Sequence, residues 1–484
     1  MLDAVVVGAG PNGLAAAVTL ARAGLTVTLI EGADRIGGGS SSAELTQPGV
    51  VHDVCSAVHP MAFASEFFRL FELERRVEFL VPEISYGQAL AEGRAVIAYR
   101  DLERTAQALA SDSVVWRRMF APLVRNDARA LGDTIGRSLV RMPEHPLTLA
   151  RFGLSALRQG TGLWNGPFET EEAAALLTGV FAHTIQRMPS VGSAAAGLAL
   201  AVFAHARGWP VPRGGSGTIT GALADDLVAH GGTIETGHWV HSLDELPPAR
   251  TTILDVTPRA FLQLAGDRLG SHGPYRRFRY GNAAAKLDLL LTDPVPWSNP
   301  ELRSAVTVHV GGTRADLASA EAAVAAGRHA RDPYVLTAQP TLLDPERAPE
   351  SASGRHVLWA YTHVPSGSSD DPTEAIVSRI ETFAPGFRDT IVASHAQSAR
   401  QLEQRNPNDV AGDIASGAVT APQLIARPVF GPHPWQTPLD GYYLCSASTV
   451  PGPGVHGMGG FNAARRALRR EFGYTRDPDL SFHG

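Results

Sequence analysis

The sequence has few cysteines, no excess of positive charge and no long apolar run, and each absence excludes a class of protein. Its two cysteines, Cys55 and Cys445, lie far apart in the chain and form neither a CxxC motif nor metal-ligand spacing, which favours a reduced, cytoplasmic protein. A formal net charge of −6 without a basic stripe argues against nucleic-acid binding. No stretch reaches the roughly 18 apolar residues of a membrane-spanning helix, and the first residues have a strand pattern instead of a secretion signal.

Lysine is almost absent, because every one of the 42 basic residues except Lys286 is an arginine. Lys286 lies in residues 283–291, an apolar segment with the pattern of a buried strand. Burying an unpaired cation in such a strand costs free energy, so a lysine at this position is expected to have a partner or a function. We therefore predict a catalytic role for Lys286; the alternative is a lysine that reaches solvent from the end of the strand.

The first forty residues contain a dinucleotide-binding pattern. A run of valines predicts a buried strand, and Gly8, Gly10 and Gly13 follow it with GxGxxG spacing ahead of a predicted helix. The amides at that helix N-terminus can bind a pyrophosphate. A second strand over residues 26–30 ends at Glu31, whose carboxylate can accept ribose hydroxyls and would repel a 2′-phosphate. The pattern predicts FAD or NAD and argues against NADP.

The segment after Glu31 favours FAD. Residues 35–42 are small and rich in glycine and serine, as expected of a loop that lies along an extended cofactor. Residues 51–60 contain His52 and His59 among polar neighbours and are interpreted as a loop lining a site, with ordinary loop histidines as the alternative. The predicted cofactor contacts in this part of the chain are Gly8, Gly10, Pro11, Asn12, Gly13, Glu31, Gly32, Arg35, Gly38, Gly39, Ser40 and His59.

Two later segments repeat the combination of glycines and a helix start. The glycines within 214–217 precede a predicted helix and then a strand predicted over 233–240. The end of that strand would place Val240 against the adenine. Because no strand precedes these glycines, they do not form a second dinucleotide site. A strand over 442–448 leads into the glycine-rich residues 451–464. The absence of a second site and of a Cys-x4-Cys pair argues against a disulfide reductase with separate FAD and NADPH domains. The predicted contacts in the last segment are Ser446, Ala447, Gly454, Val455, His456, Gly457 and Asn462.

The whole pattern predicts an α/β fold with a discontinuous Rossmann-type FAD-binding domain, a mixed-sheet substrate domain and a helical insertion. We assign residues 1–100, 208–271 and 436–484 to the FAD-binding domain, 101–207 to a helical insertion or lid, and 272–435 to the substrate domain. The insertion should contain long helices, the first over 114–139. A segment over 147–158 has a basic amphipathic pattern, which predicts either peripheral membrane contact or an ordinary lid helix.

Residues 8–13, 212–215, 406–414, 427–428, 443–445 and 451–464 together resemble bacterial phytoene desaturase-like oxidoreductases of the amine oxidase superfamily. The nearest subgroup is that of the pyridine nucleotide-disulfide oxidoreductase domain 2-like proteins. The resemblance implies FAD and the removal of a hydride from a C–C or C–N unit of a lipophilic or secondary-metabolite substrate to flavin N5. FAD should be non-covalent, because no Cys or His lies in an attachment motif. Ser446 departs from the family, in which glycine more often follows the cysteine.

The catalytic candidates are Lys286, His456, His59 and Asp413. Lys286 resembles the strand lysine of flavin amine oxidases, which reaches flavin N5 through a water. The histidines could exchange a proton beside the ring, and Asp413 follows a loop, 405–409, that the resemblance places beside the active site. For these three the alternatives are packing, backbone hydrogen bonds and turn caps; Asp255 is expected to be structural. No metal site is predicted.

Three functions remain open from the sequence. The first is a desaturase or dehydrogenase acting on a small molecule, and the second is an amine oxidase that produces an imine and hydrogen peroxide. The third is a cofactor-free binding protein, because Rab GDP-dissociation inhibitors have a similar fold. The complete glycine motif and Glu31 argue against the third, since they have little purpose without a dinucleotide.

Overall fold

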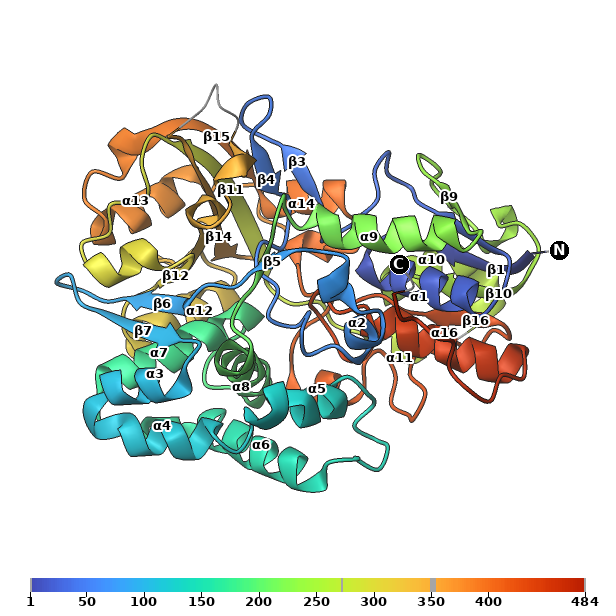
Figure 1. Ribbon diagram of the computed structural model, residues 1–484, viewed down its shortest axis with the longest axis horizontal. Helices are drawn as coiled ribbons and strands as arrows, with labels where there is room; N and C mark the ends of the chain where they lie inside the picture. Colours follow the sequence, from blue (N-terminus) through green and yellow to red (C-terminus); the bar gives the residue numbers. More distant parts are fainter. Residues whose placement is uncertain (1, 271–272, 349–353, 483–484) are drawn as a thin grey trace.

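The computed structural model describes residues 2–270, 273–348 and 354–482, and within them the chain forms two large sheets and a group of helices (Figure 1). The first sheet is parallel, with strand order β16-β10-β1-β2-β9. Its strands come from three distant parts of the chain, which meet at the right of Figure 1. The strands are β1 (Leu2–Val7), β2 (Val27–Ile30), β9 (Thr233–Glu235), β10 (Ala249–Leu254) and β16 (Tyr442–Leu444).

Alternate residues of β1 bury their side chains against helices on opposite faces of this sheet. Ala4 and Val6 pack with α1 (Pro11–Arg22), α9 (Gly217–Ala229) and α16 (Met458–Glu471). Val5 and Val7 pack with α10 (Pro258–Ala265). A strand buried on both faces explains the continuous valine run. The parallel sheet with helices on both faces confirms the predicted Rossmann-type arrangement.

The second sheet is mixed, with strand order β15-β11-β14-β13-β12-β6-β7. One of its faces carries α13 (Thr373–Phe383), which packs against Leu287, Leu289 and other apolar side chains of the sheet. The opposite face carries Lys286, Trp359 and Tyr361, because residues paired across antiparallel strands share a face. The strands are β6 (Ile84–Ala89), β7 (Ala95–Tyr99), β11 (Ala283–Leu291), β12 (Thr307–Val310), β13 (Val335–Ala338), β14 (His356–Val364) and β15 (Ile391–Gln397).

Hairpin β6–β7 shows that the predicted domain boundary at residue 100 lies too far along the chain. The hairpin was predicted and is present, but β6 pairs in parallel with β12, with Gly87 opposite Val308. Residues 84–99 therefore belong to the second sheet and not to the nucleotide-binding one. Alternating hydrophobicity predicts a strand but does not say which sheet the strand joins. The other boundaries stay predictions.

The helical insertion lies at the lower left and centre of Figure 1, beneath the second sheet. Its described part contains more, shorter helices than the sequence indicates. The single helix predicted over 114–139 is wrong, since the chain turns at Asn126 and Ala128, where φ is +51° and +56°. The helices are α3 (Leu102–Ala108), α4 (Ser113–Phe120), α5 (Arg129–Ile135), α6 (Pro146–Gln159), α7 (Glu171–Phe181) and α8 (Val191–Ala206).

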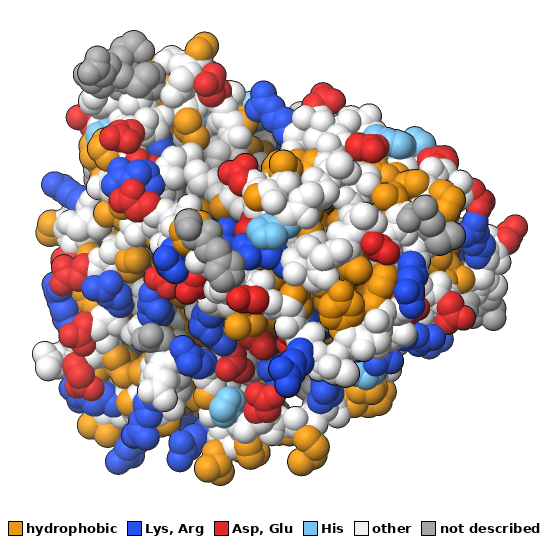
Figure 2. Space-filling model, turned by 45° about the vertical axis from the view of Figure 1, so that its right-hand side comes forward, with side chains coloured by type: hydrophobic (Ala, Val, Ile, Leu, Met, Phe, Trp, Pro, Cys, Tyr) orange, Lys and Arg blue, Asp and Glu red, His pale blue; other side chains and the backbone are white. Residues whose placement is uncertain are grey.

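Short elements connect these layers. They are α2 (Glu66–Leu70), α11 (Gly273–Arg276), α12 (Arg314–Ala325), α14 (Ala399–Arg405), α15 (Ala421–Ile425), β3 (Ser42–Glu44), β4 (Val51–Asp53), β5 (Phe79–Leu80) and β8 (Val211–Pro212). Figure 2 shows a face on which acidic and basic side chains are interspersed with apolar ones, in keeping with the small net charge of −6. Among the described residues, no helix is both long and apolar enough to cross a bilayer.

Candidate cofactor- and substrate-binding site

A cavity of about 1180 Å³ extends from the end of β1 to the helices of the insertion. This volume exceeds the roughly 300–1,000 Å³ of an ordinary small-molecule pocket, so the cavity has room for a large cofactor together with a second ligand. Segments singled out in the sequence contribute residues to its lining: 8–12, 31–43, 54–60, 238–241, 405–409 and 446–455. The cavity thus joins the separate glycine-containing segments into one site.

In the loop between β1 and α1, neighbouring atoms approach the backbone so closely that only glycine fits. Gly8 has φ of +98°, a conformation that L side chains rarely adopt. A Cβ on Gly13 would lie 1.9 Å from the Gly8 carbonyl oxygen, and a Cβ on Gly10 would lie 2.7 Å from Asp255 Oδ2. Gly8 and Gly10 line the cavity with Pro11 and Asn12, next to the N-terminus of α1. The arrangement can bind a phosphate group through backbone amides.

Asp255 holds this loop in place. Its Oδ2 accepts a hydrogen bond of 2.9 Å from the Gly13 amide, and Asn408 Nδ2 donates to its carbonyl oxygen. Burial raises the pKa of Asp255 to about 7, and the nearby charge of Glu31 adds to that increase. The expected structural role of Asp255 agrees with these contacts. Gly13 supports the loop and is not among the described residues that line the cavity.

Glu31 and Trp239 form the nucleoside end of the cavity. Glu31 Oε2 accepts from the Ala9 amide at 2.6 Å and Oε1 accepts from the Ala33 amide at 2.8 Å, which fixes the carboxylate beside the phosphate loop. Each oxygen retains lone-pair capacity for a ribose hydroxyl. Trp239, half exposed, lines the cavity next to Val240, and a Cβ on Gly32 would lie 2.6 Å from its ring. The sequence reasoning selected Val240 and missed Trp239, although Gly32 follows Glu31 directly.

The C-terminal segment closes the cavity from the other side. The Ser446 hydroxyl donates to the Val256 carbonyl at 2.8 Å, which joins two residues that both line the cavity. Helix α16 begins after Gly457, whose φ is +65°, and crosses α1 so closely that a Cβ on Gly460 would lie 1.8 Å from the Asn12 carbonyl oxygen. The glycines at 457–460 therefore serve helix packing.

The predicted cofactor contacts divide into two groups. Those that line the cavity are Gly8, Gly10, Pro11, Asn12, Glu31, Gly32, Arg35, Gly38, Gly39, His59, Val240, Ser446, Ala447, Gly454 and Val455. Those that are not among its described lining residues are Gly13, Ser40, His456, Gly457 and Asn462. In the second group, Ser40 donates to the Ser216 carbonyl and Asn462 donates to the Gly136 carbonyl, so both hold loops together.

Lys286 is not among the described residues that line the cavity, and its expected role at flavin N5 through a water stays a prediction. Lys286 is buried and donates to Asp288, two residues along the same face of β11. Its ammonium lies 5.8 Å from the centre of the Trp359 ring, and Trp359 itself lines the cavity. Burial lowers the pKa of Lys286, and the Asp288 carboxylate partly offsets that effect. The lysine therefore lies behind an aromatic wall, paired with an acid.

His456 and Asp413 are also occupied by backbone groups. His456 Nε2 lies 3.1 Å from the Gly452 carbonyl, while its Nδ1 accepts from the Met458 amide at 3.0 Å. Asp413 accepts from the amides of Gly281, Ala415 and Gly417. Neither is among the described lining residues. Their geometry fits the alternatives of backbone bonding and turn capping, and the catalytic roles stay predictions.

His59 is the catalytic candidate that the structure does bring to the cavity. Ser216 Oγ donates to the Ser56 carbonyl at 2.5 Å, so it must accept the hydrogen of His59 Nε2 at 2.7 Å. His59 Nδ1 is then an acceptor, and it is buried without a partner among the described residues. Burial lowers the pKa of His59 to about 4, so the ring is neutral. His59 can accept a hydrogen bond from a bound ligand.

Arg405 is a cavity residue that the sequence reasoning did not select. Its Nε and Nη2 are buried without partners in the described part of the chain, and the residue lines the cavity. Burial raises the pKa of the neighbouring Asp409 to about 7, and the positive charge of Arg405 acts against that increase. The sequence did mark the loop 405–409, but for its Asn and Asp side chains and not for Arg405. Unused guanidinium donors can bind an electron-rich group.

The far end of the cavity is mainly apolar. Phe152 of α6, Ala195 and Ala199 of α8, and Trp209 line it opposite Tyr361 and Trp359 of the second sheet. His183 is the imidazole at this end. Among the described residues, no group of three or more His, Cys, Asp or Glu side chains could hold a metal ion.

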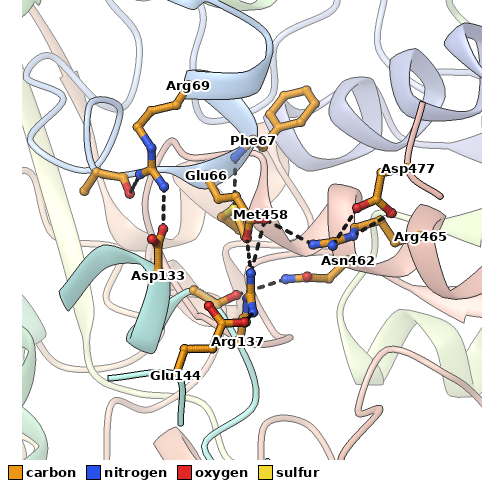
Figure 3. Close-up of polar contacts among 12 residues, drawn as sticks. Glu66, Phe67, Arg69, Asp133, Arg137, Glu144, Met458, Asn462, Arg465 and Asp477 are labelled. Atoms are coloured by element: carbon orange, nitrogen blue, oxygen red, sulfur yellow. Dashed lines mark hydrogen bonds and ion pairs between the residues drawn. The ribbon is translucent and has the colours of Figure 1, made fainter. Parts of the chain in front are cut away.

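A network of charged side chains attaches the insertion to the nucleotide-binding layer (Figure 3). Arg137, which follows α5 and lines the cavity, contacts Glu66 of α2 at 3.1 Å and also pairs with Glu144. Glu66 in turn contacts Arg465 of α16 at 3.4 Å. Figure 3 shows Asn462 of α16 pointing at the same place, where it donates to the Gly136 carbonyl. The network fixes one wall of the cavity.

Comparison with known proteins agrees with this architecture. Residues 6–72 match the model of the NAD(P)-binding Rossmann-like domain. The chain is 25% identical to pyridine nucleotide-disulfide oxidoreductase domain-containing protein 2 of Rattus norvegicus, across 96% of this chain and 93% of that protein. Among solved structures, putrescine oxidase matches with a TM-score of 0.60 at 18% identity, covering 98% and 99% of the two chains. Cyclohexylamine oxidase from Brevibacterium oxydans matches with a TM-score of 0.55 at 15% identity, covering 97% and 98%.

These similarities confirm the resemblance and the fold class that the sequence predicts. The chain contains an NAD(P)-binding Rossmann-like domain, is homologous to pyridine nucleotide-disulfide oxidoreductase domain-containing protein 2, and has the amine oxidase-type fold.

Proposed function

We propose that the protein is an FAD-dependent oxidoreductase that removes a hydride from a C–C or C–N unit of a largely apolar small molecule. The observation that carries the proposal is the single cavity, which joins a phosphate-binding glycine loop to a chamber of aromatic and aliphatic side chains. Such a cavity suits a dinucleotide cofactor and an apolar substrate in contact with each other. Homology to a protein named as an oxidoreductase supports the reaction class.

The residues present fit non-covalent FAD. The amides of the β1–α1 loop would hold its pyrophosphate, Glu31 its ribose and Trp239 its adenine. The buried acceptor His59 Nδ1 and the unused donors of Arg405 would meet polar atoms at the opposite end of the cofactor. When bound, the flavin accepts a hydride at N5 from a carbon held against its ring.

The chain itself supplies orientation and a dry environment. Trp209, Trp359 and Tyr361 present flat surfaces that can hold an apolar substrate in one position. Phe152 and the alanines of α8 exclude water from the same chamber. Burial lowers the pKa of His59 to about 4, so at neutral pH the ring is neutral, its one hydrogen is donated from Nε2 to Ser216, and Nδ1 can only accept.

Amine oxidation is the second candidate, supported by the fold shared with proteins named putrescine oxidase and cyclohexylamine oxidase. The position of Lys286 behind Trp359 does not favour the resemblance-based role of that lysine. Hydrogen peroxide release with an amine would support oxidation of amines, whereas loss of two hydrogens from a C–C unit without peroxide would support a desaturase.

Purified protein tests the cofactor proposal directly. We expect a yellow protein whose flavin is released as FAD by acid, and we expect Gly10→Ala to lose most of that FAD, because the new Cβ would lie 2.7 Å from Asp255 Oδ2 in the phosphate loop. Gly153→Ala is the matched control, since its Cβ meets nothing within 4 Å and lies in helix α6. Colourless protein that cannot be reconstituted with FAD would contradict the proposal, as would equal FAD content in the two variants.

A further inference from the structure

His183 lies at the apolar end of the cavity, near the proposed flavin-binding part. It follows α7 in a short turn, Ala182–Thr184, and its ring packs edge-on against Trp209 at a centroid distance of 5.5 Å. Trp209 precedes Pro210, whose carbonyl accepts from the His59 amide at 3.0 Å. His183 is therefore one aromatic ring away from the segment that carries His59.

A second, fully buried imidazole is hydrogen-bonded to His183. His183 Nε2 lies 3.0 Å from Nε2 of His309, which is on β12 of the second sheet. Only one of the two facing nitrogens can carry the hydrogen when both rings are neutral. Burial keeps them neutral, because it lowers the pKa of His183 to about 3 and that of His309 well below its usual value. The direction of this hydrogen bond therefore decides what His183 presents to the cavity.

Gln88 on β6 supplies an acceptor near His309, on the side away from His183. Its Nε2 donates to the Gly312 carbonyl at 2.8 Å, and because a carbonyl needs a donor, the amide cannot be reversed. Its Oε1 is thus an acceptor, and both Oε1 and His309 Nδ1 are buried without partners among the described residues. A Cβ on Gly179 would lie 2.2 Å from that Oε1 and 2.8 Å from that Nδ1, so the two atoms lie beside the same glycine, with no hydrogen bond between them. An acceptor there favours a hydrogen on His309 Nδ1.

With its hydrogen on Nδ1, His309 must accept at Nε2, so His183 donates from Nε2 and keeps a lone pair on Nδ1. We propose that His183 Nδ1 is a substrate-recognition atom that accepts a hydrogen bond from an N–H or O–H group on an otherwise apolar substrate. Gln88 and His309 are positioning residues that fix the tautomer of His183. The part of this inference that concerns a substrate rests on the function proposed above, whereas the tautomer does not.

The chamber around His183 makes this acceptor selective. Trp209, Leu200 and Leu336 line the cavity beside it, so a ligand without a donor would leave Nδ1 buried and unpaired. One neutral hydrogen bond contributes about 0.5–1.5 kcal/mol, which corresponds to a roughly 2- to 13-fold preference for the ligand with the donor. A pure hydrocarbon would gain nothing from this arrangement.

The tautomer is tested without any cofactor or substrate. In protein labelled with ¹⁵N-histidine, with signals assigned through His183→Asn and His309→Asn variants, we expect a hydrogen on Nε2 of His183 and on Nδ1 of His309. Gln88→Leu removes the acceptor and should weaken or reverse this preference. A hydrogen on His183 Nδ1 in the unaltered protein would overturn the inference, whether or not the protein binds flavin.

Ligand recognition is tested by calorimetric titration with cyclohexanol and methylcyclohexane. We expect the affinity for cyclohexanol relative to methylcyclohexane to fall by the factor given above in His183→Leu, and to recover in part in His183→Asn, whose side-chain carbonyl can accept. His205→Leu is the matched control, because His205 is another buried neutral imidazole, bonded to Trp116 and Tyr99 away from the cavity. Equal preference in the unaltered protein and in folded His183→Leu would overturn the recognition role. Missing FAD in the same preparations would instead contradict the proposed function.

Discussion

At the scale of single residues, Lys286 shows that rarity in a sequence does not by itself mark a catalytic group. Lys286 is buried and is the one lysine in the sequence, but its contacts are with Asp288 and the Trp359 ring. Asp288 also lies 3.7 Å from His52, so the polar cluster continues away from the cavity lining. The predicted strand already contains Asp288 two residues from Lys286, and alternation along a strand places both on one face; the structure shows that the two side chains pair.

The pair makes a testable prediction about stability. Asp288→Asn leaves the buried ammonium without its carboxylate and should lower the free energy of unfolding by about 3–5 kcal/mol. Lys286→Met with Asp288→Leu removes both charges, and the double variant should be much closer to the unaltered protein, since an apolar pair of similar volume is often neutral. Chemical denaturation of the three proteins measures this. Equal losses in the single and double variants would contradict the pairing. Loss of FAD reduction in a stable Lys286→Met would restore a catalytic role.

At the scale of elements, the nucleotide-binding strands could be predicted because each carries its own signal. The valines of β1, the glycines after Val7 and the acid at the end of β2 specify a strand, a turn and a helix within thirty residues. The second sheet lacks such local signals. Pairing of β6 with β12 joins residues more than two hundred positions apart, and no pattern in either strand names the partner. The same limitation hid the His183–His309 contact, which crosses from the insertion to that sheet.

Helix α6 keeps the amphipathic character that the sequence indicates. Phe152 and Ala156 face inward, and Phe152 lines the cavity, while Leu154 and Leu157 are 70% and 54% exposed. Arg151 and Arg158 are the charged residues of the helix, so its outer face carries basic and apolar groups without an acid. These features support peripheral contact with an anionic membrane as a proposal.

Vesicle binding tests the role of α6. We expect the protein to co-sediment with anionic vesicles. Leu154→Glu should weaken that association by about tenfold, because full burial of a leucine side chain contributes roughly 1.5–3 kcal/mol and about 1.4 kcal/mol corresponds to a tenfold change in affinity. Val228→Glu is the control, because Val228 is 59% exposed on α9. Equal sedimentation of both variants would contradict the proposal and leave α6 as a lid helix.

At the scale of the whole molecule, the cavity depends on how the insertion sits on the nucleotide-binding layer. Arg137 connects them, because it follows α5, lines the cavity and contacts Glu66 of α2 (Figure 3). Glu66 also meets Arg465 of α16, so one carboxylate serves two guanidinium groups from different layers. The sequence shows how many charged residues there are, but its composition and periodicity do not predict that side chains from three distant segments meet at Glu66.

Glu66 and Glu144 provide a matched comparison, since both contact Arg137 but their side chains are 16% and 59% exposed. Glu66→Gln should cost about 1.5–3 kcal/mol, the range for a hydrogen bond to a charged group, whereas Glu144→Gln should cost at most about 1 kcal/mol, because exposed pairs are screened. The loss at Glu66 should appear as faster amide hydrogen exchange in α5 and in the N-terminal turn of α16, with little change in β11 or β14. If both variants exchange alike, the Glu66 carboxylate does not hold the insertion in place, and its other contacts, such as Arg69 with Asp133 and Asn462 with the Gly136 carbonyl, are sufficient.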